Sequence, residues 1–260
     1  MSAQKRKKLA GNHQKSWLWG RHLVMETVTS GRWIPRNLIL SEDLSQNELT
    51  QLLSCCDKYN IPVSRESSAR LTELCRASDH QGYLARMPEF RYENFSDFQK
   101  KIAATTSGTI LILDRIQDPH NLGAILRSAE VLGASGLILG TRHQVGITTA
   151  VARASAGAIN HLPVVQVEGL LETVRLLQEL NFKVVGTALQ NSEPLNADSF
   201  GPRNAILIGN ESNGVASELL DACNLRVRIP QSGQLDSLNA AVAAGILLYA
   251  AMTNKASLSR

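Results

Sequence analysis

The chain has 260 residues, of which 43% are hydrophobic and 19% charged, so it belongs to the ordinary globular class with room for one large domain or two modest ones. Its formal net charge of +4 is concentrated at one end: residues 1–21 hold six lysines and arginines and no acid, which leaves 21 basic against 23 acidic residues elsewhere. No stretch reaches the roughly 18 apolar residues of a membrane span. The amino-terminal end lacks the apolar segment of a secretory signal, whereas an organelle transit role stays open.

The basic residues 1–16 are predicted to be a disordered tail. Such an arm suits an anionic polymer, because each phosphate contact releases counterions, but a purely solubilising tail has the same composition. Both interpretations stay open. KRKK at 5–8 also fits a nuclear signal, which is a match of low specificity.

Residues 17–88 alternate helical and extended patterns, which predicts a compact α/β domain. Helices are expected at 22–31, 47–60 and 67–76, and strands at 37–41, 61–64 and 80–87. The first helix is expected to end at Gly31. The polar and aromatic stretch 89–107 is predicted to be a linker with room for a short helix.

Four cysteines, Cys55, Cys56, Cys75 and Cys223, are too few for a disulfide framework in a chain of this length. None forms a CxxC pair, and no nearby histidine completes a zinc-binding spacing, so the sequence predicts no metal site. A reducing compartment, the cytoplasm, is therefore expected.

Residues 108–260 contain apolar runs that recur between helical segments. The runs are short and nearly continuous, as expected of strands covered on both faces. They lie at 109–114, 136–140, 163–167, 183–187, 205–209 and 226–230. The alternation implies an α/β fold with a mostly parallel sheet and helices on both faces. Ligands bind outside the carboxyl ends of such strands, which directs attention to the loops after Asp114, Thr187, Gly209 and Pro230.

The loop after the first of these strands leads into a helix, DPHNLGAILRSAEVLG (118–133). Asp118 is a good N-cap, and Pro119 is favoured at the first helical position. Arg127 projects away from the apolar stripe of this helix, so on local grounds it is a solvated surface charge.

The remaining loops carry no known nucleotide motif, because GxGxxG after the first strand and GxxxxGK[ST] are both missing. Turn chemistry alone explains GNESNG (209–214), although a glycine at 209 also lets backbone approach a flat ligand closely.

Together, three separated stretches resemble the ordered motifs of the SpoU (TrmH-like) branch of the SPOUT RNA methyltransferases. The first is NxxGxxxR, with Asn121, Gly123 and Arg127; the second is GxE, with Gly209 and Glu211; the third is IP…SLN, with Ile229, Pro230, Ser237, Leu238 and Asn239.

The resemblance spans roughly 110–250, and residues 17–88 resemble the L30e-like substrate-binding domain often fused to these enzymes. Two positions depart from the pattern. Asn210 stands where a small residue is expected, and Asp236 adds an acid beside Ser237. Either departure could alter substrate choice, but neither removes a motif residue.

The resemblance implies a deep C-terminal trefoil knot within residues 108–260, which periodicity would not suggest. It implies that S-adenosylmethionine binds in this knot, with an adenosine pocket made by Gly209, Ile229 and Leu238 and with Thr187 nearby. Without the resemblance, Ile229 and Leu238 would be interpreted as core residues. No metal is required, because the sulfonium already carries the driving charge.

The resemblance also places Asn121, Arg127, Glu211, Ser237 and Asn239 around the reacting ribose hydroxyl. Arg127 would bind a neighbouring phosphate or stabilise the developing alkoxide, since a guanidinium is a poor base. Glu211 is the more conventional base, but it equally suits a cap of the NESNG turn. Ser237 and Asn239 lie near the start of the last helix, where one of them is expected to be an N-cap.

The sequence therefore predicts an enzyme that transfers a methyl group from S-adenosylmethionine to a ribose 2′-hydroxyl of RNA, first of all a guanosine of large-subunit (23S) ribosomal RNA. The resemblance implies a homodimer through the knotted domain, with active sites close to the interface. Transfer RNA is the alternative substrate. A nonenzymatic RNA-binding or ribosome-assembly factor is the alternative class, and the missing fingerprint disfavours a nucleotide-dependent oxidoreductase.

Overall fold

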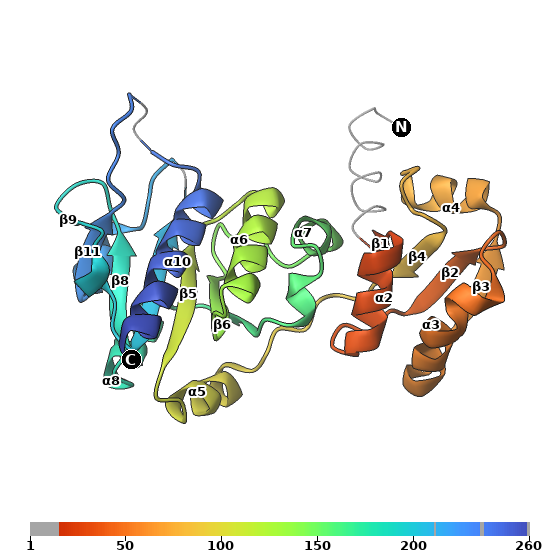
Figure 1. Ribbon diagram of the computed structural model, residues 1–260, viewed down its shortest axis with the longest axis horizontal. Coiled ribbons are helices and arrows are strands. Elements are labelled where there is room, and N and C mark those ends of the chain that lie inside the picture. Colours follow the sequence, from red (N-terminus) through yellow and green to blue (C-terminus); the bar gives the residue numbers. More distant parts are fainter. Residues whose placement is uncertain (1–15, 211, 235–236, 259–260) are drawn as a thin grey trace. The chain divides into compact units, whose positions relative to one another are not determined.

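The computed structural model describes residues 16–210, 212–234 and 237–258, so almost all of the basic tail lies outside the described residues. The chain forms two compact units (Figure 1). The first comprises the described residues up to Arg91 together with Ile147–His161. The second comprises Tyr92–Gly146 and the residues from Leu162 onward. In the part of the chain that is described, no helix has the length and apolarity to cross a membrane.

The first unit is built on a four-stranded sheet with the order β1-β4-β2-β3. β4 runs antiparallel to β1 and β2, and β3 runs parallel to β2. The elements are β1 (Trp17–Trp19), α2 (Arg21–Ser30), β2 (Asn37–Ser41), α3 (Gln46–Tyr59), β3 (Val63–Glu66), α4 (Ser68–Cys75) and β4 (Tyr83–Arg86). The helices and strands expected over 17–88 are all present within a few residues of their predicted bounds, and β1 is an additional strand.

Local sequence explains where these helices begin and end. α2 ends at Gly31, which adopts the left-handed conformation with φ 63°. α3 begins with a capping box in which Ser45 and Glu48 satisfy each other's backbone donors. At the start of α4, the Ser67 hydroxyl accepts from the Arg70 amide at 3.3 Å.

The second unit is a seven-stranded sheet with the order β7-β6-β5-β10-β8-β11-β9, and every pairing in it is parallel. Its strands are β5 (Gly108–Asp114), β6 (Gly136–Gly140), β7 (Val164–Val167), β8 (Lys183–Thr187), β9 (Glu193–Pro194), β10 (Arg203–Gly209) and β11 (Leu225–Arg228). Its helices are α5 (Phe95–Ala103), α6 (Pro119–Val131), α8 (Leu170–Glu179), α9 (Ser217–Ala222), α10 (Ala240–Leu258) and the short 3-10 helix η2 (Ala197–Ser199).

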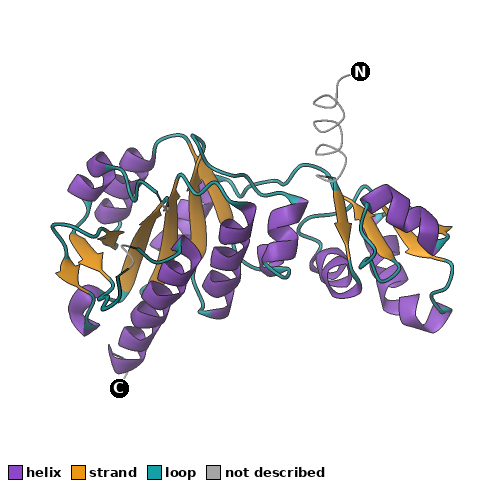
Figure 2. Cartoon of the chain, turned by 90° about the horizontal axis from the view of Figure 1, so that it is seen from above, coloured by secondary structure: helices purple, strands orange, loops and turns teal. Residues whose placement is uncertain are grey.

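Helices cover both faces of this sheet (Figure 2). α5, α8 and α9 share one core with Ile110 and Ile112 of β5, while α6 and α10 pack against each other on the other face. The stretch 89–107, predicted as a linker with room for a short helix, contains the helix α5, which buries Phe98 and Ile102 to 1% and 3% exposure. The segment Tyr92–Gly146, which includes α5, therefore belongs to the second unit.

A second difference concerns the connection between β6 and β7. The sequence assigns all of 108–260 to one domain, whereas α7 (Thr149–Ala154) and η1 (Ala158–Asn160) pack within the first unit. Val151, Ala152 and Ile159 are almost completely buried there.

Candidate active site

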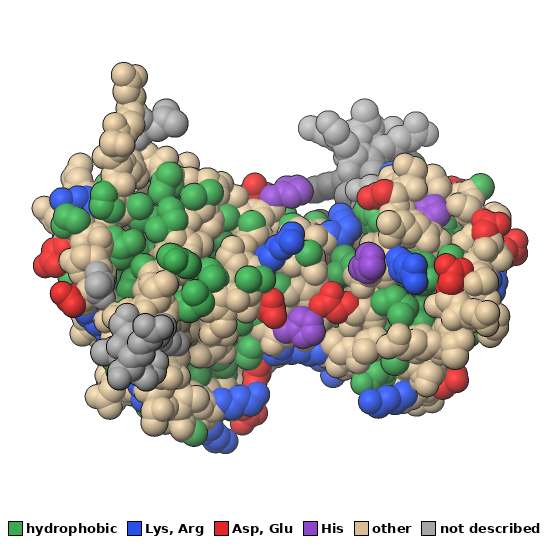
Figure 3. Space-filling model, viewed as in Figure 1, with side chains coloured by type: hydrophobic (Ala, Val, Ile, Leu, Met, Phe, Trp, Pro, Cys, Tyr) green, Lys and Arg blue, Asp and Glu red, His purple; other side chains and the backbone are tan. Residues whose placement is uncertain are grey.

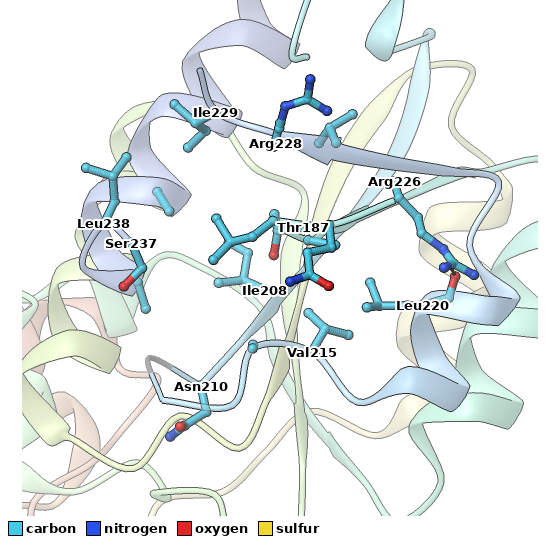
Figure 4. Close-up of a pocket in the computed structure, with 18 of the residues that line it drawn as sticks. Thr187, Ile208, Asn210, Val215, Leu220, Arg226, Arg228, Ile229, Ser237 and Leu238 are labelled. Carbon is cyan, nitrogen blue, oxygen red and sulfur yellow. Dashed lines mark hydrogen bonds between the residues drawn. The ribbon is translucent and has the colours of Figure 1, made fainter. Parts of the chain in front are cut away.

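A pocket of about 560 Å³ opens at the carboxyl ends of β8, β10 and β11 (Figure 4). Most of its described lining comes from residues 187–191 at the end of β8, 208–210 and 212–215 after β10, 226–231 at the end of β11, and 237–243 at the start of α10. This is the edge of a parallel sheet where ligands usually bind, and the volume lies in the range of roughly 300–1,000 Å³ that small-molecule sites occupy.

The pocket brings together five residues predicted from the sequence: Thr187, Gly209, Ile229, Ser237 and Leu238. Its wall is largely apolar, with Ile208, Val215 and Leu220 added to the predicted side chains (Figure 4). Sequence reasoning missed these three, because single aliphatic residues on a strand, a turn and a helix look like ordinary core.

The arginines of β11 also line this pocket, and both are engaged by the chain itself. Arg226 donates from Nη2 to Asp221 at 2.6 Å and from Nε to the Leu220 carbonyl at 3.1 Å. Arg228 donates to the Ser192 carbonyl. These bonds hold the two guanidinium groups at the outer part of the wall, and sequence reasoning had singled out neither.

Gly209 is required for a reason that differs from the one suggested by the sequence. A Cβ at this position would lie 2.1 Å from the carbonyl carbon of Gly214 and 2.2 Å from the amide nitrogen of Val215. The chain's own turn makes a close approach at Gly209, and any larger residue would displace that turn.

Asn210 organises this turn. Its Oδ1 accepts from the amides of Ser212 at 2.9 Å and Asn213 at 3.3 Å, and its Nδ2 donates to the Arg115 carbonyl at 3.1 Å. The departure from the family pattern at 210 therefore stabilises the turn. Glu211, the second-motif acid, lies outside the described residues.

Asp114 and Arg115 connect the first loop to the same turn. Asp114, 4% exposed at the end of β5, accepts from the Ala216 amide at 2.8 Å and pairs with Arg115 at 3.0 Å. Arg115 donates in addition to the Gly214 carbonyl at 3.2 Å. Sequence reasoning missed both residues, although an acid at the end of a wholly apolar strand was an available signal.

Asn121 and Asn239 meet although they are 118 residues apart in the chain. Asn239 Nδ2 donates to Asn121 Oδ1 at 2.9 Å. Asn239 Oδ1 accepts from the amides of Ala241 at 2.9 Å and Val242 at 3.3 Å, so Asn239 is the N-cap of α10. The cap expected from either Ser237 or Asn239 is thus Asn239, whereas Ser237 lies in the pocket wall.

Arg127 is the predicted site residue that stands apart. It is exposed on α6, and it makes no hydrogen bond or ion pair with another described residue. Six residues separate it from Asn121, which places it about 9 Å further along the helix and about 120° around it. It is not among the residues that line the pocket.

The parallel sheet and its strand-end pocket define an α/β protein with a small-molecule site at the edge of its sheet. Comparison with known proteins makes this class specific. The chain matches the SpoU rRNA Methylase family over residues 108–249 and the family described as RNA 2′-O ribose methyltransferase substrate binding over residues 17–93.

Relatives of similar length agree. The chain is 35% identical over 232 residues, 88% of its own length and 92% of the relative's, to a Staphylococcus saprophyticus protein named as a TrmH family tRNA/rRNA methyltransferase. A Bacillus subtilis protein with the same family name is 34% identical over 240 residues, covering 92% and 95% of the two chains. The crystal structure of an AdoMet-bound rRNA methyltransferase from Sinorhizobium meliloti superposes with a TM-score of 0.79 at 26% identity, over 95% and 90% of the chains.

The chain therefore belongs to the SpoU rRNA methylase family. It is an RNA methyltransferase of the SpoU/TrmH type with an N-terminal substrate-binding domain, and its cofactor is S-adenosylmethionine. The predicted SPOUT-type α/β fold is confirmed. The apolar pocket fits this cofactor, because aliphatic side chains can enclose an adenine ring while backbone groups at the strand ends satisfy its polar edge.

Proposed function

We propose that this protein methylates the ribose 2′-hydroxyl of a guanosine in large-subunit (23S) ribosomal RNA, in the cytoplasm. The observation that carries the proposal is the pair of matches over both units, since the first unit matches a substrate-binding family named for RNA 2′-O ribose methyltransferases. The similar Sinorhizobium structure is named as an rRNA methyltransferase, which favours ribosomal over transfer RNA.

The pocket would hold the cofactor, with Ile229 and Leu238 against the adenine and with Thr187 and Gly209 at the strand ends. Thr187 donates its hydroxyl to the Leu207 carbonyl at 3.1 Å, so it contributes a fixed wall rather than a free donor. When bound, S-adenosylmethionine supplies an electrophilic methyl group. The residues around it have to hold the ribose oxygen within about 3–3.5 Å of that group and remove its proton.

We assign Glu211 as the proton acceptor, because a carboxylate is the conventional base among the motif residues. Asn121 and Ser237 would orient the ribose. Asn239 is a positioning residue in this scheme: both its oxygen and its amide nitrogen are engaged, and they join the start of α10 to the first turn of α6.

Arg127 is assigned to the RNA phosphate next to the target or to the developing alkoxide. Its exposure and its place outside the pocket of its own chain suggest that it serves the pocket of a second copy. Val131 lies one turn further along α6, on the same face as Arg127, and is 70% exposed. The neighbourhood of Arg127 is therefore partly apolar.

α10 continues this apolar surface. Val242, Ile246, Tyr249 and Met252 recur at helical spacing and are exposed, and with Val131 they form the α6–α10 stripe (Figure 3). A hollow of about 310 Å³ lies within it, lined by Val131, Leu132, Leu248 and Met252 among others. Contiguous apolar surface of this kind marks an interaction site, and we infer that a second copy of the chain covers it.

The first unit is proposed to bind the RNA, and residues 1–16 to add non-specific attraction to its phosphates. One experiment tests substrate and reaction together. Deletion of the gene, followed by mapping of ribose methylation in 23S, 16S and transfer RNA, should remove a single 2′-O-methylguanosine from 23S RNA, and the purified protein should restore it. A missing base methylation, or a missing transfer RNA mark, would contradict the proposal.

A further inference from the structure

The middle of the connection between β6 and β7 belongs to a different unit from the two strands that it joins. β6 ends at Gly140 and β7 begins at Val164, and the two strands are parallel neighbours in the second unit. Such a crossover usually carries a helix that covers its own sheet. Here Ile147–His161, which we name the clasp, is part of the first unit, where α7 packs against β1.

Arg153 fastens the clasp to β1. Its guanidinium carbon lies 3.6 Å from the centre of the Trp19 ring, and its Nη1 donates to the Trp17 carbonyl at 3.4 Å. The Trp19 indole is fixed in turn, because its Nε1 donates to Asp79 at 2.9 Å. A half-buried cation stacked on a tryptophan is a strong form of this interaction, so Arg153 is a specific attachment point.

The other end of the clasp is fastened to α2. Asn160 Nδ2 donates to Thr27 Oγ1 at 3.1 Å, and both residues are buried. His161 Nε2 lies 2.6 Å from Glu26 Oε1. Gly157 has a φ of 90°, a conformation that favours glycine, and a Cβ there would lie 2.3 Å from Glu26 Oε2 and would displace that carboxylate.

The residues just before the clasp hold the loop that carries the first motif. Val145 donates its amide to the Ile116 carbonyl at 2.8 Å, and Gln144 Oε1 accepts from the Ile116 amide at 2.9 Å. Ile116 is fully buried two residues before the Asp118 cap of α6. Both backbone groups of Ile116 are thus bonded by residues that lead directly into the clasp.

We propose that Arg153 and Gln144 are positioning residues for methyl transfer. When RNA binds to the first unit, the clasp transmits the effect of binding to the loop that positions Asn121 and Arg127. The proposed path begins at the contact of Arg153 with β1 and runs through the clasp to the peptide bond Gly146–Ile147. It ends at the hydrogen bonds of Gln144 and Val145 to Ile116. Neither positioning residue lines the cofactor pocket. This inference rests on the proposed RNA methyltransferase function.

Three variants test the path, with methyl transfer measured at saturating RNA and cofactor. Arg153→Ala is expected to lower kcat at least tenfold, with the Kd for S-adenosylmethionine unchanged within twofold and the Kd for RNA within about threefold. Arg153→Lys keeps a cation over Trp19 and is expected to recover most of the rate. Gln144→Ala removes the side-chain hydrogen bond to Ile116 at the other end of the path. Its kcat should fall as much as that of Arg153→Ala.

The double variant Arg153→Ala/Gln144→Ala decides whether the two residues act through one path. Its kcat should equal that of the single variants, because two substitutions that interrupt the same path are not additive. A rate equal to the product of the two single losses would overturn the proposal. So would weakened RNA binding with an unchanged kcat, which would make the clasp only a part of the RNA-binding surface.

Control variants distinguish a loss of the clasp's effect from misfolding and from a general effect of removing an arginine. Arg175→Ala removes an exposed arginine of α8 and should leave kcat within twofold. Should Arg153→Ala not fold, as judged by cooperative melting and cofactor binding, Gln144→Ala decides alone, and a wild-type kcat there overturns the proposal. A wild-type protein that methylates no RNA contradicts the proposed function. If the wild type is active and the variants are fully active too, only the proposed role of the clasp is contradicted.

Discussion

The cofactor pocket and the α6–α10 stripe belong to the same unit but are built in opposite ways. Around the pocket, the polar side chains that shape the wall are bonded to the chain itself: Thr187 to Leu207, Asn210 to its own turn, and Asp114 to Ala216. On the stripe, apolar side chains such as Tyr249 are 59% exposed, and Arg127 has no partner among the described residues.

The difference separates two steps of the activity. Cofactor binding should be a property of one folded chain, because the pocket is complete in it. Methyl transfer should depend on the second copy that we propose to cover the stripe, because Arg127 is proposed to serve the pocket of that copy. Four predictions follow this division, in order of decreasing effect.

The largest effect is expected from Arg127→Ala. It should lower methyl transfer at least 1,000-fold, since a charged group stabilising a transition state in a closed site contributes roughly 3–4 kcal/mol or more. Cofactor affinity, measured by calorimetry, should stay within twofold. Lost cofactor affinity would contradict the assigned role and would place Arg127 in the pocket.

Mixing two inactive variants sharpens the same prediction. Leu238→Arg fills the pocket and should abolish cofactor binding, while Arg127→Ala leaves the pocket intact. If Arg127 serves the partner's pocket, a mixture of the two, unfolded and refolded together, should recover about a quarter of wild-type activity, because half the molecules become mixed dimers with one working site. No recovery, in a mixture shown to form mixed dimers, would place Arg127 at its own pocket.

Asp114→Ala should disturb the pocket without touching the ligand. The substitution removes the acceptor of the Ala216 amide and the ion pair to Arg115, and a hydrogen bond to a buried charge contributes roughly 1.5–3 kcal/mol. We expect unfolding free energy to fall by about 3 kcal/mol in urea titrations and cofactor affinity to fall about tenfold. Unchanged affinity in a folded variant would show that the 209–216 turn does not form the ligand-binding wall.

Tyr249→Glu should weaken the association of two copies of the chain through the α6–α10 stripe. A charge at the middle of the stripe would be buried against apolar surface in a dimer, so we expect the dimer Kd, from light scattering over a concentration series, to rise at least tenfold. Arg175→Ala, which also lowers the net charge by one and lies on α8, is the matched charge control. Cofactor binding by the Tyr249→Glu monomer should persist, and a monomeric wild type would refute the inferred interface.

The smallest effect concerns alkaline pH. Burial raises the pKa of the Cys223 thiol to about 11 from an ordinary value of 9.0. Between these values the unfolded chain releases the proton first, so stability should be complete below pH 9 and should fall as pH rises towards 11. Cys223→Ala should reduce this slope by up to one proton, and an unchanged slope would show that the thiol is accessible to water. The slope that remains in that variant is expected to come from Cys56, whose pKa burial also raises to about 11.

Several features could be predicted because their causes are local. The Asp118 cap accepts from the His120 amide at 2.9 Å, two residues away, and the sequence alone indicates it. The strands of the second unit were predictable because nearly continuous apolar runs are typical of a covered parallel sheet. Thr187, Gly209, Ile229, Ser237 and Leu238 line one pocket, as expected from the motifs, although their roles stay predictions.

Other features could not be predicted because their partners are distant in the chain. Asn239 meets Asn121 across 118 residues, and Asp114 accepts from Ala216 across 102. Periodicity records which face of an element is apolar, but not which distant backbone group a polar side chain will reach. For the same reason, the sequence does not indicate that the turn at Gly214 and Val215 packs directly against Gly209.

The sequence by itself determined the α/β class, most of the elements, the family motifs and, through them, the cofactor. Only the tertiary structure decided that Arg127 does not line the pocket of its own chain and that Asn239 is the N-cap of α10. It also decided that Ile147–His161 folds with the first unit. The physical reason is that caps and apolar periods depend on neighbours within a few residues, whereas Arg153 on Trp19 depends on a contact that exists only once both segments are folded.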